Sequence, residues 1–252
     1  MWSAERLIHV WIWVAYAILP LYVYFGLACI LNKGSKYLVA YSLLFGIYGV
    51  IPHNFIYMFV LHIFLSIFSL TPSNKKNPKS LFLFIGISPI IYILTNMPLF
   101  LLLFMAKGLE YPIPMSIDQL IMLSRNGNLI NIFTFSNNWW PRVPATLLKN
   151  PSFRITSLIL FTMAFSATLI KTKREYKVLA LLSSVFIIGL IFFAQGANNP
   201  ILLGIIYVCG QLGRIDIFAP LREWGRLSIL IPIFLVLLLL GIASSKGKKN
   251  CS

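Results

Sequence analysis

The stretch LIHVWIWVAYAILPLYVYFGLACIL, residues 7–31, contains one histidine and no Asp, Glu, Lys or Arg. About 20 consecutive apolar residues are enough to cross the hydrocarbon core of a membrane as a helix. The stretch is longer than the apolar part of a signal sequence, and Pro20 predicts a kink within it. It therefore predicts a membrane-spanning helix at the start of the sequence.

The composition of the whole chain also indicates that the protein lies in a membrane. Of its 252 residues, 59% are hydrophobic and 11% are charged, and the mean hydropathy is +0.85. A water-soluble domain of this size needs a largely polar surface, which this composition cannot supply. We expect an all-α fold, a polytopic transmembrane helical bundle that forms a single domain over residues 1–252.

Further apolar runs of suitable length follow along the sequence. The run from residue 37 to residue 70 is too long for one untilted span and short for two, and Pro52 divides it. Lysines stand at both of its ends, which places both ends on one side of the membrane and favours a hairpin over one broken helix. The predicted spans are residues 7–31, 37–51, 55–70, 81–106, 155–170, 178–194 and 227–245.

Basic residues indicate how these spans are oriented. Lysine and arginine are enriched in cytoplasmic loops, and they concentrate here at residues 33–36, 75–79 and 171–177 and in the C-terminal tail. Seven crossings of the cell membrane then leave the N-terminus outside and the C-terminus in the cytoplasm. A chain that begins outside, close to its first span, is either the later part of a longer membrane protein or an ordinary protein of this orientation.

Charge and cysteine content argue against nucleic-acid binding, metal sites and disulfides. The formal net charge of +15 arises from 21 basic and 6 acidic residues. The basic residues lie in short loops, where insertion topology and anionic lipid headgroups explain them better than nucleic acid does. Cys29, Cys209 and Cys251 lack CxxC spacing, so we expect neither a zinc site nor a disulfide framework. His53 and His62 have no third ligand nearby, which favours hydrogen bonds between helices over a metal site.

Two predicted outer segments, 107–154 and 195–226, are longer than the inner connections, and long structured loops tend to carry function. In the first, the capping-box pattern from Ser116 to Gln119 predicts a short helix through Leu123 that lies in the membrane interface. A turn at residues 125–128 and an aromatic belt at residues 137–142 are expected to follow it.

The second outer segment begins with QGANNP, residues 195–200, which is expected to end the preceding helix. Residues 201–212 are apolar but too short to cross, so we expect a re-entrant or interfacial segment there. A charged stretch, IDIFAPLREWGRLSIL at residues 215–230, then leads into the last span.

This second segment resembles C-type (GT-C fold) glycosyltransferases of archaea and bacteria, with the likeness covering roughly residues 124–245. The residues that carry it are a helix end, a short apolar segment and an aromatic-flanked charged motif, namely Gly196, Pro200, Phe218, Arg222, Glu223 and Arg226. Trp224 stands where the family usually has a proline. The resemblance implies that the chain engages sugars carried on polyprenyl phosphate at the outer face of the membrane.

The candidate substrate-binding residues are Arg214, Asp216, Arg222, Glu223 and Arg226. An arginine guanidinium pairs bidentately with phosphate oxygens and stays charged at any relevant pH. The two acids could orient an arginine or accept a hydrogen bond from a sugar hydroxyl. The alternative is that these arginines extend to the phosphates of bulk lipid and pair with the neighbouring acids.

A transferase of this kind needs a carboxylate as general base or as a ligand for a divalent metal. The resemblance implies an acid in the first outer loop, often within an acidic pair. Glu5 has no acidic neighbour, and Glu110 and Asp118 are eight positions apart. We therefore expect an incomplete catalytic site, and we assign no catalytic residue, metal ligand or cofactor.

Three functions remain open from the sequence. The first is part of a lipid-linked-sugar glycosyltransferase, for which a partner membrane chain could supply the missing acid. The second is a non-catalytic membrane subunit of a larger complex. The third is a transporter of lipid or solute, which is disfavoured because no predicted span carries an acid or a lysine at its centre.

Overall fold

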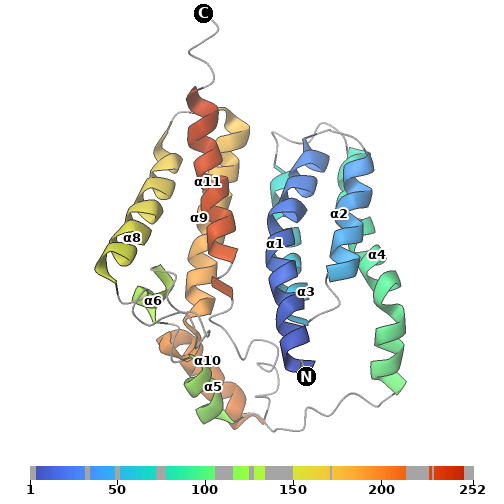
Figure 1. Cartoon of the computed structure of the whole chain (residues 1–252), viewed down its shortest axis with the longest axis vertical. Helices are drawn as coiled ribbons and strands as arrows, with labels where there is room; N and C mark the ends of the chain where they lie inside the picture. Colours follow the sequence, from blue (N-terminus) through green and yellow to red (C-terminus); the bar gives the residue numbers. More distant parts are fainter. Residues whose placement is uncertain are drawn as a thin grey trace, which may run out of the picture. The chain divides into compact units, whose positions relative to one another are not determined.

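The computed structural model describes residues 4–31, 35–48, 52–71, 78–105, 116–124, 128–133, 150–170, 172–213, 227–228 and 230–246. All regular elements within these ranges are helices, which confirms the predicted all-α fold. Contacts group the chain into two compact units, residues 1–112 and 113–252 (Figure 1). The assembly of both units into one transmembrane domain stays a prediction.

The first unit consists of four helices that correspond to the first four predicted spans. They are α1 (Ala4–Ile30), α2 (Ser35–Tyr48), α3 (Pro52–Ser69) and α4 (Pro78–Met105). Helices α1 and α4 have 27 and 28 residues and continue through internal prolines. At about 1.5 Å per residue, each is roughly 40 Å long.

Helices α2 and α3 form an antiparallel pair, so residues 37–70 contain two helices and not one broken helix. That both helices cross a membrane stays a prediction. The rings of Phe45 and Phe55 lie 6.1 Å apart between centroids, and the Tyr41 hydroxyl lies 2.8 Å from Nδ1 of His62. The second pair lies further from Pro52 than the first on both sides, as in a chain that folds back on itself. Pro52 is the first residue of α3, a position where its missing N–H is not needed.

The interior of the first unit contains polar groups that pair between helices. The Tyr22 hydroxyl of α1 donates to the Tyr41 hydroxyl of α2 at 2.5 Å, and Tyr41 in turn contacts His62 of α3. This network confirms the predicted role of His62 in helix packing. Ser42 and Ser88 join their hydroxyl oxygens at 3.0 Å between α2 and α4. Paired polar groups thus hold the four helices in register.

A close contact between α2 and α4 lies at Gly46. Asn96 of α4 donates from Nδ2 to the Gly46 carbonyl at 3.0 Å, and a Cβ built on Gly46 would lie 2.6 Å from Oγ1 of Thr95. The absence of a side chain at Gly46 therefore permits the hydrogen bond from Asn96, as small residues do at helix contacts in membranes.

The second unit contains three helices that correspond to the remaining predicted spans, together with shorter ones. The elements are α5 (Ile117–Ser124), α6 (Leu129–Phe133), α8 (Pro151–Ser166), η1 (Ala167–Leu169), α9 (Arg174–Ala194), η2 (Gly196–Asn198), α10 (Pro200–Gln211) and α11 (Ile231–Lys246). Helices α8 and α9 are joined by a short turn, and α11 contacts both of them. The rings of Phe186 and Phe234 stack at 5.5 Å between α9 and α11.

Capping explains where two of these helices begin. The predicted capping box is confirmed, because Gln119 N donates to Ser116 Oγ at 3.2 Å and Ser116 N donates to Gln119 Oε1 at 3.0 Å. Helix α8 begins at Pro151, four residues before the predicted span at residue 155. Asn150 caps this helix by accepting from Ser152 N at 2.9 Å, and Pro151 occupies its first turn.

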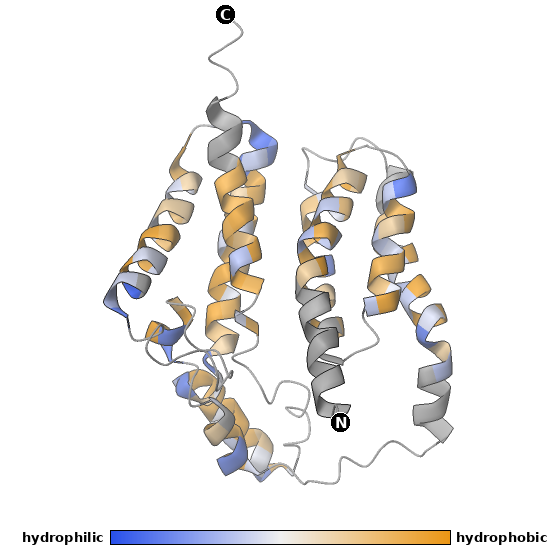
Figure 2. Ribbon diagram, viewed as in Figure 1, coloured by the Kyte–Doolittle hydropathy of each residue, from blue (hydrophilic) through white to orange (hydrophobic). Residues whose placement is uncertain are grey.

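The helices place large apolar side chains on their outer faces. On α9, Leu181, Val185 and Ile188 are 48%, 63% and 61% exposed, whereas Ser183 is fully buried. On α2 and α3, the outer rows are Val39, Leu43 and Ile47, and Phe59, Ile63 and Ile67. Figure 2 shows apolar residues on the helices of both units. A helix in water has the reverse arrangement.

One helix within the described ranges is both long and apolar enough to cross a membrane, and it is α9. The other apolar helical stretches whose side chains the structure describes are 10–17 residues long, and they include Ala17–Ile30 of α1 and Phe84–Pro98 of α4. Helix α2, with 14 residues, spans only about 21 Å at 1.5 Å per residue. Seven complete crossings therefore stay a prediction.

Replacing Gly46 with alanine should destabilise the first unit, because the new Cβ would force α2 and α4 apart. Overpacking of this kind costs about 1–3 kcal/mol. Gly86→Ala is the matched control, since a Cβ on Gly86 meets nothing within 4 Å and alanine is the better helix former. Thermal unfolding of the purified protein should show a lower Tm for Gly46→Ala and an equal or higher Tm for Gly86→Ala. Equal Tm values for both variants would contradict the close contact.

Candidate functional site

The predicted substrate-binding residues, Arg214, Asp216, Arg222, Glu223 and Arg226, lie outside the described residues. So do Glu110 and the residues of the predicted aromatic belt. Asp118 lies in the first turn of α5 and is exposed, and Glu5 lies in the first turn of α1. The described part of the predicted outer segments is therefore formed by residues 116–124, 128–133, 150–154 and 195–213.

The segment from Gln195 to Pro200 ends α9 and starts α10, as predicted. Gly196 has a φ of 51°, in the left-handed region that glycine adopts without strain. Asn199 caps α10 by accepting hydrogen bonds at Oδ1 from Ile201 N at 3.0 Å and Leu202 N at 3.4 Å. Pro200 then occupies the first turn of the new helix. The chain thus turns sharply between two helices through η2.

Ser124, the last residue of α5, holds this turn. Its Oγ accepts from Ala197 N at 2.9 Å and donates to the Leu120 carbonyl at 2.8 Å. The Ser124 carbonyl accepts a hydrogen bond from Nδ2 of Asn198. Ser124 and Ala197 are both buried, so the hydroxyl satisfies a backbone N–H that water cannot reach.

Apolar packing joins α5 to α10 beside this turn. Leu120, Ala197, Leu202 and Ile206 form a buried cluster. The opposite face of α10 exposes Ile201, Ile205, Val208 and Leu212. Helix α10 has 12 residues and a length of about 18 Å, which is too short to cross a hydrocarbon core of about 30 Å. Its position in the membrane, interfacial or re-entrant, stays a prediction.

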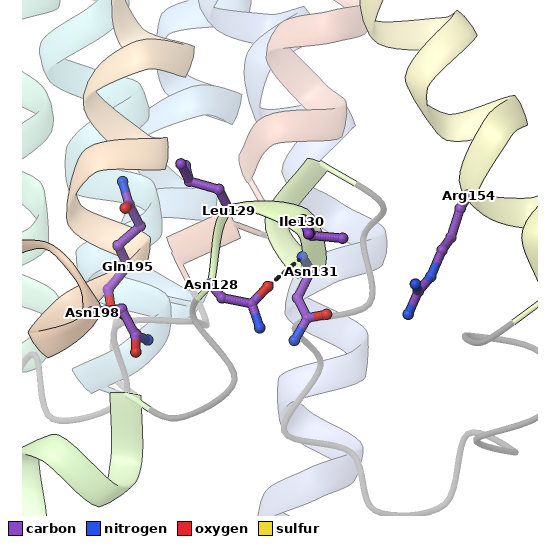
Figure 3. A pocket seen from close by; sticks show the side chains of 7 residues that line it. All are labelled: Asn128, Leu129, Ile130, Asn131, Arg154, Gln195 and Asn198. Atoms are coloured by element: carbon purple, nitrogen blue, oxygen red, sulfur yellow. Dashed lines mark hydrogen bonds between the residues drawn. The ribbon is translucent and has the colours of Figure 1, made fainter.

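A pocket opens next to the turn, between α6, the first turn of α8 and the end of α9. Its volume is about 620 Å³. Figure 3 shows the side chains that line it, Asn128, Leu129, Ile130, Asn131, Arg154, Gln195 and Asn198. Among these residues are four amides and one arginine, and none of them is acidic.

Helix α6 forms one wall of the pocket and is fixed by two contacts. Ile132 is fully buried, and the ring of Phe133 meets the ring of Phe161 of α8 edge-on at 5.2 Å. Asn128 starts the helix by accepting from Asn131 N at Oδ1, at 2.8 Å. The polar residues of α6 therefore have a fixed position at the pocket.

Hydrogen bonds decide which atoms of the amides point to a ligand. Asn128 uses its Oδ1 in the cap, so its Nδ2 group offers donors. Asn198 donates from Nδ2 to the carbonyls of Ser124 and Gln195, and Gln195 donates from Nε2 to the Ile191 carbonyl at 3.2 Å. Asn198 and Gln195 are thus left with acceptor oxygens. The pocket combines donors and acceptors with one permanent positive charge on Arg154.

The pocket and the basic turn lie at opposite ends of the α8–α9 hairpin. Arg154 is in the first turn of α8 and Gln195 follows the last residue of α9, whereas Lys173, Arg174 and Lys177 lie where the two helices are connected. The C-terminal end of α11 lies near the connection, since α11 contacts η1. These three basic residues thus lie at the opposite end of the hairpin from the pocket, whose described lining contains one basic residue, Arg154.

Sequence reasoning identified the helix break at Gly196 and Pro200 but missed the pocket. Asn128 and Asn131 belong to a helix of five residues, too short to give a periodic signal. Arg154 is the last residue of the predicted outer segment 107–154, whereas the structure places it in the first turn of α8, after the cap at Asn150. The spacing Asn128-x-x-Asn131 and the pair Asn150-Pro151 are helix-start signals that could have found these residues.

Within the described part of the chain, no group of three His, Cys, Asp or Glu side chains is arranged to hold a metal ion. Cys29 and Cys209 are free thiols.

Comparison of the chain with protein-family models, with characterised proteins and with solved structures gives no match.

Replacing Ser124 with alanine should loosen the turn that bounds the pocket. The buried N–H of Ala197 would lose its acceptor, which costs about 1–3 kcal/mol. Ser166→Ala is the matched control, because Ser166 is exposed and its hydroxyl bonds only within its own helix turn, to the Met163 carbonyl at 2.6 Å. We expect a lower Tm for Ser124→Ala and an unchanged Tm for Ser166→Ala. A Tm equal to that of the wild type in both variants would disprove the role of Ser124.

Proposed function

We propose that the chain is an integral membrane protein whose outer helix faces contact lipid, with about seven crossings. The observation that carries this proposal is the distribution of side chains on α9, where serines are buried and Leu181, Val185 and Ile188 are exposed. In water this distribution would leave a large apolar patch uncovered. In a bilayer the apolar side chains contact lipid, and small polar residues allow close helix contacts.

The orientation of the protein follows from its basic turns. The turn at residues 171–177 and the lysines near the C-terminus belong on the cytoplasmic side. The pocket at the other end of the α8–α9 hairpin then belongs on the outer side, and the N-terminus is also outside. This orientation brings the second outer segment, 195–226, to the same surface as the pocket.

The proposed function is to bind a sugar carried on polyprenyl phosphate at this outer surface, as part of a glycosyltransferase. The resemblance over residues 124–245 supports it, and so does the helix break at Gly196 and Pro200, the two motif residues within the described part. Arg222 and Arg226 would hold the phosphate through bidentate, charge-assisted hydrogen bonds. A partner chain would supply the catalytic acid, since the sequence has no acidic pair at the start of the chain.

Lipid binding tests this function. The protein would be placed in nanodiscs of phosphatidylcholine and titrated with a polyprenyl-phosphate-linked hexose, with bound lipid counted by native mass spectrometry. The double variant Arg222→Gln, Arg226→Gln should bind about tenfold more weakly or worse, because each lost charged hydrogen bond costs about 1.5–3 kcal/mol.

Two controls complete this experiment. Lys173→Gln combined with Arg174→Gln removes the same charge from the basic turn and should leave the affinity unchanged. Arg222→Lys with Arg226→Lys keeps the charge without the planar fork, so its affinity should be intermediate. Unchanged affinity in the double glutamine variant would show that the two arginines only anchor the chain in bulk lipid.

A further inference from the structure

We propose that the pocket between α6, α8 and the end of α9 binds a phosphate ester that carries hydroxyl groups. Arg154 would contact the phosphate, and the amides of Asn128, Asn131 and Asn198 would contact the hydroxyls. This assignment deepens the proposed function, on which the choice of a lipid-linked ligand rests. It adds a second binding region to the one predicted at Arg222 and Arg226.

The amides suit a hydroxyl-bearing ligand because they offer both kinds of hydrogen-bonding atom. A hydroxyl group donates one hydrogen bond and accepts up to two. Asn128 presents donors at Nδ2, whereas Asn198 and Gln195 present acceptor oxygens, as their other hydrogen bonds require. In Figure 3, Asn128, Asn131 and Asn198 extend from α6 and η2 into the same region.

Arg154 gives the site its preference for an anion. It is half-buried, and its guanidinium carries five N–H donors in one plane, enough for a phosphate in addition to another contact. None of the described residues that line the pocket is acidic, so no carboxylate there opposes a negative ligand. The pocket has a volume of about 620 Å³ and is open on one side, so a bound phosphate ester would stay partly exposed.

The rim of the pocket suits a ligand with an apolar part. Leu129 and Ile130 line it and are 46% and 64% exposed, so an isoprenoid or acyl chain could lie against them. The site is also at the end of the long apolar helix α9, which in the proposed orientation is where lipid headgroups meet a spanning helix. A polyol phosphate attached to a lipid therefore fits both the polar lining of the pocket and its apolar rim.

The experiment compares three probes in phosphatidylcholine nanodiscs, namely a polyprenyl-phosphate-linked hexose, the same polyprenyl phosphate without the sugar, and phosphatidylglycerol. A water-soluble hexose 1-phosphate is a fourth probe. Arg154→Gln should bind all phosphate probes at least about tenfold more weakly than the wild type. Asn131→Ala should make the affinities for the sugar-bearing and the sugar-free polyprenyl phosphates more similar, since Asn131 is one of the residues proposed to contact the sugar hydroxyls.

Arg174→Gln is the matched control, because Arg174 is exposed in the first turn of α9 at the opposite end. It should bind every probe as the wild type does. Tm values near that of the wild type would show that all three variants fold. If Asn131→Ala is destabilised, Asn131→Asp replaces it, and its added negative charge should weaken binding of every phosphate probe.

The outcomes separate this site from the proposed function. If Arg154→Gln and the Asn131 variant bind like Arg174→Gln, the pocket is not the site, although a loss in the Arg222 and Arg226 variant would still support the function. If the pocket variants lose only hexose 1-phosphate or phosphatidylglycerol, the site stands and the polyprenyl-linked ligand is wrong. If the wild type binds none of the four probes, both proposals fail.

Discussion

The structure depends on one constraint, which is that a buried polar group costs free energy unless it finds a partner inside the protein. Within the described residues, the hydroxyls of Ser66 and Ser183 and Oδ1 of Asn96 are buried without a hydrogen bond, whereas other buried groups pair between helices. In the first unit, the Tyr22 and Tyr41 hydroxyls and His62 form a chain across three helices, and Ser42 pairs with Ser88. The outer rows on α2, α3 and α9 are instead made of Leu, Ile, Val and Phe. Lipid tails cannot donate or accept hydrogen bonds, so an unpaired polar group in contact with them costs several kcal/mol of free energy. Helices that pair their polar groups with one another avoid this cost.

The same constraint shapes the end of the second unit that carries the candidate site. A chain that leaves α9 and enters α10 within a few residues exposes backbone groups at both helix ends. Ser124 and Asn199 satisfy several of them, through Ala197 N, Ile201 N and Leu202 N. Because these contacts fix the turn, Gln195 and Asn198 reach the pocket in defined orientations, opposite Arg154. The site is thus a consequence of how the helix break is stabilised.

Much of the fold could be predicted from the sequence, because long apolar runs have few alternatives to a helix. The hairpin of α2 and α3 followed from the lysines at both ends and from Pro52, and α5 followed from the Ser116 capping box. Helix α8 starts before the predicted span, since the apolar run begins after Phe153 while the helix begins directly after its cap, Asn150. Within the described residues, α9 is the one helix that is both long and apolar enough to cross a membrane, so the number of crossings rests on sequence alone.

The candidate site was harder to predict. The pocket draws on residues 128–131, 154 and 195–198, which tertiary packing brings together and no local pattern links. The cluster from Arg214 to Arg226, by contrast, was conspicuous in the sequence, and it lies outside the described residues. Local charge in the sequence therefore pointed to residues 214–226, while the geometry of Ser124 and Asn198 pointed to the pocket beside α6.

The contact of α9 with lipid is the central claim, and spin-label accessibility tests it most directly. A nitroxide would be attached at position 185 of a variant with all three cysteines replaced by serine, reconstituted in liposomes. Collisions with oxygen, which dissolves in the hydrocarbon, should then be frequent, and collisions with a water-soluble nickel chelate should be rare. Frequent collisions with the nickel chelate and few with oxygen would place Val185 in water and contradict the account.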